Sequence, residues 1–137
     1  MSTRIWPLPF AVLVLGCSAQ LAEPDVRATE DEPFAIRVGE SARVFTGAGH
    51  VVIEFVAVSE DSRCPVDVDC VWSGDATVEL RVRDASPDEL ALHTHLEPQA
   101  GVIDGFELRL LALEPEPNSE RQIMPDEYLA QLLVTRR

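Results

Sequence analysis

The chain has 137 residues, of which 46% are hydrophobic, and a formal net charge of -13. This length suits one domain and this hydrophobic fraction is enough for a folded interior, which excludes a wholly disordered chain. All 11 basic residues are arginines, against 24 acidic residues. The surface therefore lacks the clustered positive charge that binding to nucleic acid or to anionic lipid headgroups requires.

The N-terminus has the features of an export signal. Arg4 is followed by an apolar run that ends at Gly16 and spans about 11 residues, fewer than the roughly 20 of a membrane-spanning helix. Val14–Cys17 resembles the lipobox of bacterial lipoproteins, in which a lipid is attached to the cysteine and cleavage makes that cysteine the new N-terminus. The resemblance predicts a lipoprotein signal peptide over residues 1–16 and a lipid anchor on Cys17. An ordinary cleaved signal peptide and an uncleaved anchor are the alternatives.

Residues 17–33 are polar, acidic and without periodicity, which predicts a flexible tether between the lipid and the folded body. Ser18 follows the cysteine at the position where, in enteric bacteria, an aspartate retains a lipoprotein at the inner membrane. By resemblance to that sorting rule, the outer membrane is favoured. The expected location is the bacterial cell envelope, with the membrane as a partner through the lipid on Cys17.

The remaining residues, 34–137, predict β-strands. Apolar and polar residues alternate with the period of two that gives a strand one buried face. This pattern covers Ala76–Arg83, Phe106–Leu110 and Tyr128–Val134, with shorter candidates at Phe34–Val38, Ala42–Thr46 and Leu90–Leu96. Val51–Val58 is apolar on nearly both faces, which is typical of a central strand.

Turn signals separate these segments. Asp104-Gly105 predicts a tight hairpin, and Pro125–Glu127 is expected to form one helical turn before the last strand. About seven short strands with regularly spaced turns predict an all-β domain, an Ig-like antiparallel β-sandwich. A small closed barrel is the alternative.

The stretch CPVDVDCVWSG, from Cys64 to Gly74, carries the densest chemistry of the chain. The cysteine spacing is not C-x-x-C, and no further cysteines complete a zinc site. A Cys64–Cys70 disulfide is therefore expected in an exported chain, stabilising the fold by about 2 kcal/mol for so short a loop. Trp72 is expected to pack across the loop onto the core, with an exposed binding anchor as the alternative. Gly74 allows a positive φ where the chain turns into the next strand.

The longer stretch DSRCPVDVDCVWSGDA, Asp61 to Ala76, resembles a motif of uncharacterised bacterial secreted proteins and lipoproteins, roughly D-S-R-C-P-x-x-x-x-C-x-W-x-G. The likeness extends to the later stretch LEPEP, residues 113–117, and to the strand near Tyr128. The resemblance implies a compact exported β domain and the Cys64–Cys70 bridge. It implies no activity.

Two groups of side chains raise the question of a metal. Carboxylates are the ligands that calcium prefers, and four aspartates surround the motif, although their spacing lacks the glycine and terminal glutamate of an EF-hand. They are Asp61, Asp67, Asp69 and Asp75. His93 and His95 suit zinc or copper only if a third ligand converges, and His50 is the remaining histidine. No metal site and no cofactor are expected.

The sequence contains no G-x-S-x-G elbow and no glycine-rich phosphate loop. The function expected is therefore a non-enzymatic envelope lipoprotein that acts as a binding or interaction module toward an envelope protein, with protease inhibition as a subclass. The candidate binding loop comprises Arg63, Asp67, Asp69 and Trp72. The alternative is a metal-dependent or hydrolytic periplasmic enzyme that uses the aspartate cluster or the histidine pair.

Overall fold

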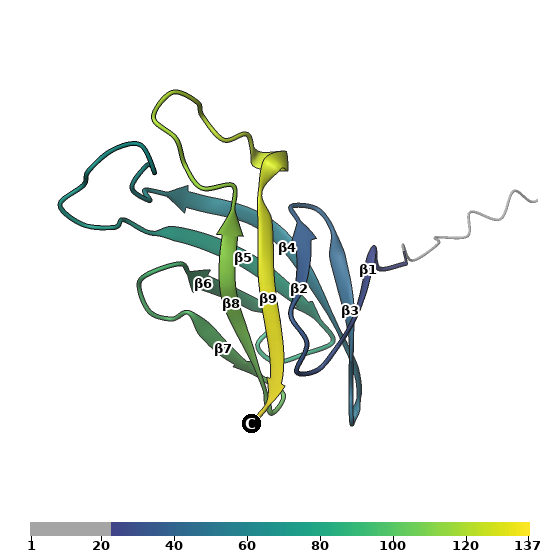
Figure 1. Cartoon of the computed structure of the whole chain (residues 1–137). Coiled ribbons are helices and arrows are strands. Elements are labelled where there is room, and N and C mark those ends of the chain that lie inside the picture. The colour runs from purple at the N-terminus through teal and green to yellow at the C-terminus, as the bar shows by residue number, and fades with distance from the viewer. Residues whose placement is uncertain (1–22) are drawn as a thin grey trace, which may run out of the picture.

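The computed structural model describes residues 23–137, which form two β-sheets packed face to face (Figure 1). The first sheet has the order β1-β3-β4-β5-β6, with β1 at Val26–Thr29, β3 at Ser41–Thr46, β4 at Gly49–Asp61, β5 at Ala76–Arg83 and β6 at Glu89–His93. The second has the order β2-β9-β8-β7, with β2 at Phe34–Arg37, β7 at Ala100–Ile103, β8 at Phe106–Glu114 and β9 at Leu129–Arg136. Both sheets are open, so the predicted β-sandwich is confirmed and the barrel is not formed.

Every strand predicted from periodicity is present, with changes at the ends. β4 is longer than the expected Val51–Val58, and β6 ends at His93 instead of Leu96. The reason for the shorter β6 is local, because the backbone N–H groups of His95 and Leu96 donate to the Asp75 side chain and not to a neighbouring strand. The hairpin at Asp104-Gly105 is confirmed, with positive φ angles of 47° and 84°, as a two-residue type I′ turn requires.

β1 corrects the tether prediction. Residues 17–33 were expected to be a flexible tether, but Val26–Thr29 pairs in parallel with β3, from Val26 opposite Ala42 to Thr29 opposite Phe45. Val26 and Ala28 pack against the core. Four residues in an acidic setting give only two apolar positions, which is too short a pattern to recognise as a period.

The predicted signal peptide over residues 1–16 and the lipid site at Cys17 lie outside the described residues. Within residues 23–137, no helix has the length and apolar character needed to cross a membrane.

The core lies between the two sheets and is built from the inward positions of the alternating strands. In β5 the buried residues are Ala76, Val78, Leu80 and Val82, and in β9 they are Ala130, Leu132 and Val134. Each buried Val or Leu side chain stabilises the fold by roughly 1.5–3 kcal/mol. Such a core gives the connecting loops a rigid support.

Three loops gather at one end of the sandwich (Figure 1). They are the β4–β5 loop (residues 62–75), the β6–β7 loop (94–99) and the β8–β9 loop (115–128). The last contains the predicted helical turn, a 3-10 helix at Pro125–Glu127. We call this the loop end.

Candidate functional site

The β4–β5 loop is closed by the two cysteines of the motif. The sulfur atoms of Cys64 and Cys70 lie 2.10 Å apart, at disulfide distance, as predicted. At the base of the loop the chain pairs with itself, because Ser62 N–H donates to the Asp75 carbonyl and Cys64 N–H donates to the Ser73 carbonyl. The β4–β5 ladder therefore continues into the loop as far as the disulfide.

Gly74 meets two separate requirements at this base. Its φ is +71°, as predicted, which L side chains rarely adopt. In addition, a Cβ at this position would lie 1.9 Å from the carbonyl oxygen of Ser62. The pairing of the two ends of the loop therefore depends on the absence of a side chain here.

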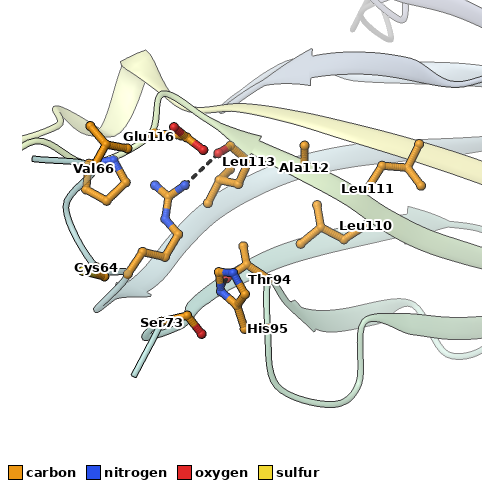
Figure 2. Close-up of a pocket in the computed structure, with 12 residues that line it drawn as sticks. Cys64, Val66, Ser73, Thr94, His95, Leu110, Leu111, Ala112, Leu113 and Glu116 are labelled. Atoms are coloured by element: carbon orange, nitrogen blue, oxygen red, sulfur yellow. Dashed lines mark hydrogen bonds between the residues drawn. The ribbon is translucent and has the colours of Figure 1, made fainter. Parts of the chain in front are cut away.

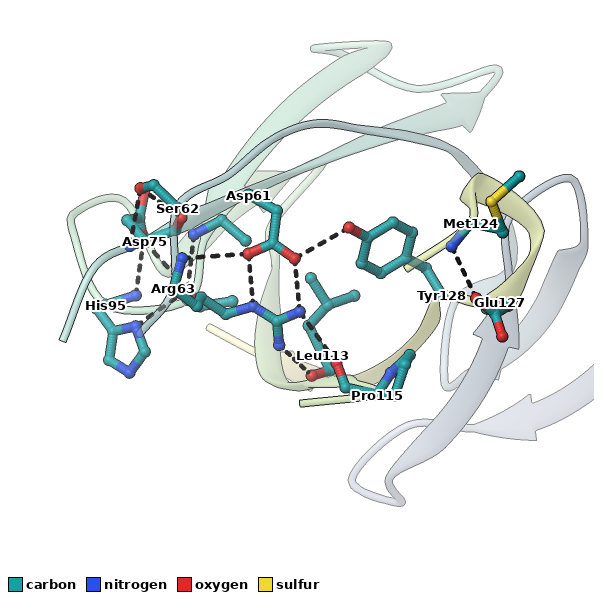
Figure 3. Close-up of polar contacts among 12 residues, drawn as sticks. Asp61, Ser62, Arg63, Asp75, His95, Leu113, Pro115, Met124, Glu127 and Tyr128 are labelled. Carbon is teal, nitrogen blue, oxygen red and sulfur yellow. Dashed lines mark hydrogen bonds and ion pairs between the residues drawn. The ribbon is translucent and has the colours of Figure 1, made fainter. Parts of the chain in front are cut away.

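Arg63, a residue of the predicted binding loop, is buried, which corrects the prediction that it is exposed on the loop surface. Its guanidinium points inward and forms a two-pronged ion pair with Asp61, with Nε to Oδ1 at 2.8 Å and an Nη to Oδ2 at 2.7 Å (Figure 3). The two side chains are only 7% and 13% exposed. A buried guanidinium without a partner is costly, so the aspartate two residues earlier keeps Arg63 inside.

The remaining donors of Arg63 bind the second sheet. One Nη donates to the Leu113 carbonyl at 2.7 Å and the other to the Pro115 carbonyl at 3.0 Å. Leu113 lies near the end of β8, and Pro115 is the first residue after it. Arg63 therefore ties the base of the β4–β5 loop to the end of β8 in the second sheet.

Tyr128 completes this buried group. Its hydroxyl donates to Asp61 Oδ2 at 2.9 Å (Figure 3). Burial, together with the hydrogen bond to the Asp61 carboxylate and its negative charge, raises the pKa of Tyr128 to about 12. Burial on its own would raise the pKa of Asp61, but the hydrogen bonds and positive charge of Arg63 outweigh it and lower that pKa below its ordinary value.

Asp75 ties the β4–β5 loop to the β6–β7 loop. Its buried carboxylate accepts hydrogen bonds from the N–H groups of His95 and Leu96, from the Thr94 hydroxyl and from Nδ1 of His93 at 2.6 Å. Burial opposes ionisation, but the donors, led by the His95 N–H, the His93 ring and the Leu96 N–H, lower the pKa of Asp75 to about 2. The carboxylate is thus a fixed acceptor for a loop backbone.

Asp67 ties the same loop to the β8–β9 loop. It accepts hydrogen bonds from the backbone N–H of Ser119 at 2.9 Å and from the Ser119 hydroxyl. Val66 N–H donates to the Pro117 carbonyl at 2.9 Å nearby. Asp67 and Asp69 are both exposed, and Asp67 in addition positions two loops against each other.

The four aspartates and the histidine pair do not converge on a common point. Asp61, Asp67 and Asp75 each have different partners, and His93 contacts Asp75 while Nδ1 of His95 lies 3.1 Å from the Thr94 hydroxyl. Within residues 23–137 no group of three or more His, Cys, Asp or Glu side chains is placed to hold a metal ion.

Trp72 was expected to pack onto the core, but its side chain is 55% exposed, which agrees with the alternative of an exposed residue. The inward positions of the loop are taken by Arg63, Gly74 and Asp75, so the intervening residues project beyond the sandwich. Seven of the nine large exposed hydrophobic residues in the described part of the chain lie at or beside the loop end. They are Val66, Val68, Val71, Trp72, Leu96, Leu111 and Met124. An exposed apolar patch of this kind indicates an interaction site.

A cleft of about 370 Å³ opens beside these residues (Figure 2). Val66, Leu111 and Pro117 contribute to its apolar walls, and Glu116 and His95 lie on opposite sides of it. The Arg63 side chain also lines the cleft, with its guanidinium paired to Asp61. Leu111 reaches the cleft because β8 has a bulge there, between the pairs Leu110–Leu132 and Ala112–Gln131, and a bulge redirects a side chain.

Sequence reasoning missed Tyr128, Leu111 and Glu116 as residues of this site. Tyr128 was expected only as part of a buried strand face. The LEPEP stretch, residues 113–117, was the one sequence feature that pointed to this site. It contains both carbonyls that Arg63 binds, and also Glu116 and Pro117 of the cleft. The two stretches that carry the resemblance, residues 61–76 and 113–117, are thus in direct contact.

Comparison with protein-family models gave no match, and comparisons with curated proteins and with solved structures gave none either.

Proposed function

We propose that the chain is a lipid-anchored lipoprotein of the bacterial envelope, favoured at the outer membrane, whose β-sandwich is a non-enzymatic recognition module. The envelope assignment follows from the export signal and the lipobox-like Val14–Cys17. A disulfide at Cys64–Cys70 is consistent with an oxidising compartment. The module binds an envelope protein through the loop end.

One observation carries the recognition role: Trp72 and Val71 are exposed on a loop that is held from several sides. Exposed tryptophans on rigid loops are typical centres of binding energy. A fixed loop also loses less conformational entropy on binding than a mobile one. The disulfide, the Arg63–Asp61 pair and the Asp75 contacts all restrict this loop.

The alternative, an enzyme built on the aspartates, would need carboxylates directed toward a substrate. Asp61, Asp67 and Asp75 instead accept hydrogen bonds from Arg63, Ser119 and the β6–β7 loop. Their positions support a role in shaping the loop end.

The test is chemical crosslinking in living cells of the native host, followed by purification of the chain through an affinity tag. Wild type is compared with Trp72→Ala and with a control, Phe45→Ala, which removes an aromatic side chain of similar exposure at the opposite end of the sandwich. We expect one discrete crosslinked partner in wild type and in the control, and its loss in Trp72→Ala. Circular dichroism checks that each variant is folded. A partner retained equally in all three proteins would contradict the proposal.

A further inference from the structure

We infer that the loop end recognises a positively charged protein segment, one in which an apolar side chain is flanked by lysine or arginine. This inference rests on the proposed recognition role and specifies the chemistry of the partner. It is carried by the charge of the three loops together with the apolar residues between them.

The loop end has a strong negative charge, and neither of its two arginines is unpaired. The three loops contain eight acidic residues and two arginines. Arg63 lines the cleft but pairs with the buried Asp61, and Arg121 pairs with Glu127 at 2.6 Å. Asp69 and Glu120 are exposed, and Glu116 lies at the cleft. Carboxylates around an apolar patch favour a basic partner and speed its association.

The cleft sets the size of the apolar group. Its volume of about 370 Å³ is near the lower end of the range for small-molecule sites, and residues of the β4–β5 loop form part of its wall. It suits one large side chain inserted beside Val66 and Leu111, with a flanking basic residue close to Glu116. Trp72 and Val71 then offer further apolar contact outside the cleft.

Two other occupants conflict with the charge. A symmetric dimer through this surface would place two sets of eight acidic residues against each other, and like charges across an interface are strongly unfavourable. An anionic lipid surface is repelled in the same way. A basic protein segment avoids this repulsion, because its positive charges take the place of the solvent cations around the carboxylates.

The test is selection of random linear peptides displayed on phage against the purified full chain in detergent. The selected peptides are synthesised, and their dissociation constants are measured for wild type, Trp72→Ala, Val71→Ser and Glu116→Gln. Phe45→Ala and Asp104→Asn serve as controls, since both positions lie at the opposite end of the sandwich. Val71 is fully exposed, so Val71→Ser provides a second apolar test that leaves the core intact.

We expect selected peptides enriched in lysine or arginine beside an aromatic or aliphatic residue. Each loop-end variant should weaken their binding about tenfold, while the controls leave it unchanged, and added salt should weaken it further. Acidic or uncharged peptides whose binding still depends on Trp72 would overturn the basic-partner inference and leave the recognition role intact. The absence of any peptide that depends on Trp72 or Val71 would reject both.

Discussion

The carboxylate of Asp61 accepts four hydrogen bonds, three from Arg63 and one from Tyr128. Through Arg63 it is linked to the carbonyls of Leu113 and Pro115 on the opposite sheet. A motif that reads as a surface loop in the sequence thus includes a buried ionic link between the sheets. The exposed part of the loop is stabilised by side chains that are themselves buried.

Replacing Asp61 by asparagine tests this link. Asp61→Asn removes the countercharge of a guanidinium that stays buried, and we expect the free energy of unfolding to fall by about 3 kcal/mol, measured by urea denaturation. The matched control is Glu107→Gln, which breaks a 2.7 Å ion pair with Arg109 whose side chains are more exposed. Exposed pairs of this kind contribute at most about 1 kcal/mol. Equal losses in the two variants would show that the buried Arg63–Asp61 pair contributes no more to the free energy of unfolding than an exposed pair.

Tyr128 gives a direct optical report on the same group, because it is the single tyrosine of the chain. Its pKa of about 12, against an ordinary 10.0, predicts that the tyrosinate absorbance of the folded protein rises near pH 12. Since the folded state resists this ionisation, the stability it contributes is intact below about pH 10 and is lost as the pH rises toward 12. Asp61→Asn should lower the midpoint by removing the neighbouring negative charge. A midpoint near 10 in folded wild type would contradict the contact.

The β4–β5 loop carries Trp72 and Val71, and Gly74 is the position at which this loop is most sensitive to substitution. Gly74→Ala combines a positive φ with a clash against the Ser62 carbonyl, whereas Gly39→Ala has a φ of +88° and open space around its Cβ. We expect Gly74→Ala to lower the free energy of unfolding clearly more than Gly39→Ala, which carries only the conformational cost of about 1 kcal/mol. Thermal unfolding of both variants measures the difference. Equal losses in the two variants would mean that the clash with the Ser62 carbonyl adds nothing to the cost of Gly74→Ala.

At the level of elements, local patterns in the sequence were sufficient where a strand has one buried face. The alternation in residues 76–83 and 106–110 predicted β5 and most of β8, and Asp104-Gly105 predicted the hairpin between β7 and β8. β1 was missed because four residues carry too little pattern. The disulfide was predicted because its partners are six positions apart and few cysteines are available.

The site itself was harder to predict because its contacts join distant parts of the chain. Arg63 was expected on the surface, and its burial depends on carbonyls 50 and 52 positions away. Trp72 was expected to be buried, but other residues of its loop fill the inward positions. Local patterns do not encode which of several polar and aromatic residues in one loop will face inward.

For the molecule as a whole, the fold places the loop end beyond a rigid sandwich, and the proposed lipid would hold the chain at a membrane. The proposal predicts that Cys17→Ala shifts the protein from the membrane fraction to the soluble fraction of the host. The reason is that a cysteine is required for attachment of the lipid. Ser18→Ala, at the neighbouring residue, is the control and should remain with membranes. Membrane association of Cys17→Ala equal to that of wild type would reject the anchor.

The loop end is expected to contact a partner protein in the envelope. The most direct measurement places a photoreactive phenylalanine analogue at position 71, where Val71 is fully exposed, and in a second protein at position 45 on the opposite end. After irradiation of living host cells, we expect a discrete protein adduct from position 71 and none from position 45. The absence of an adduct at position 71, or the same adducts from both positions, would contradict this expectation.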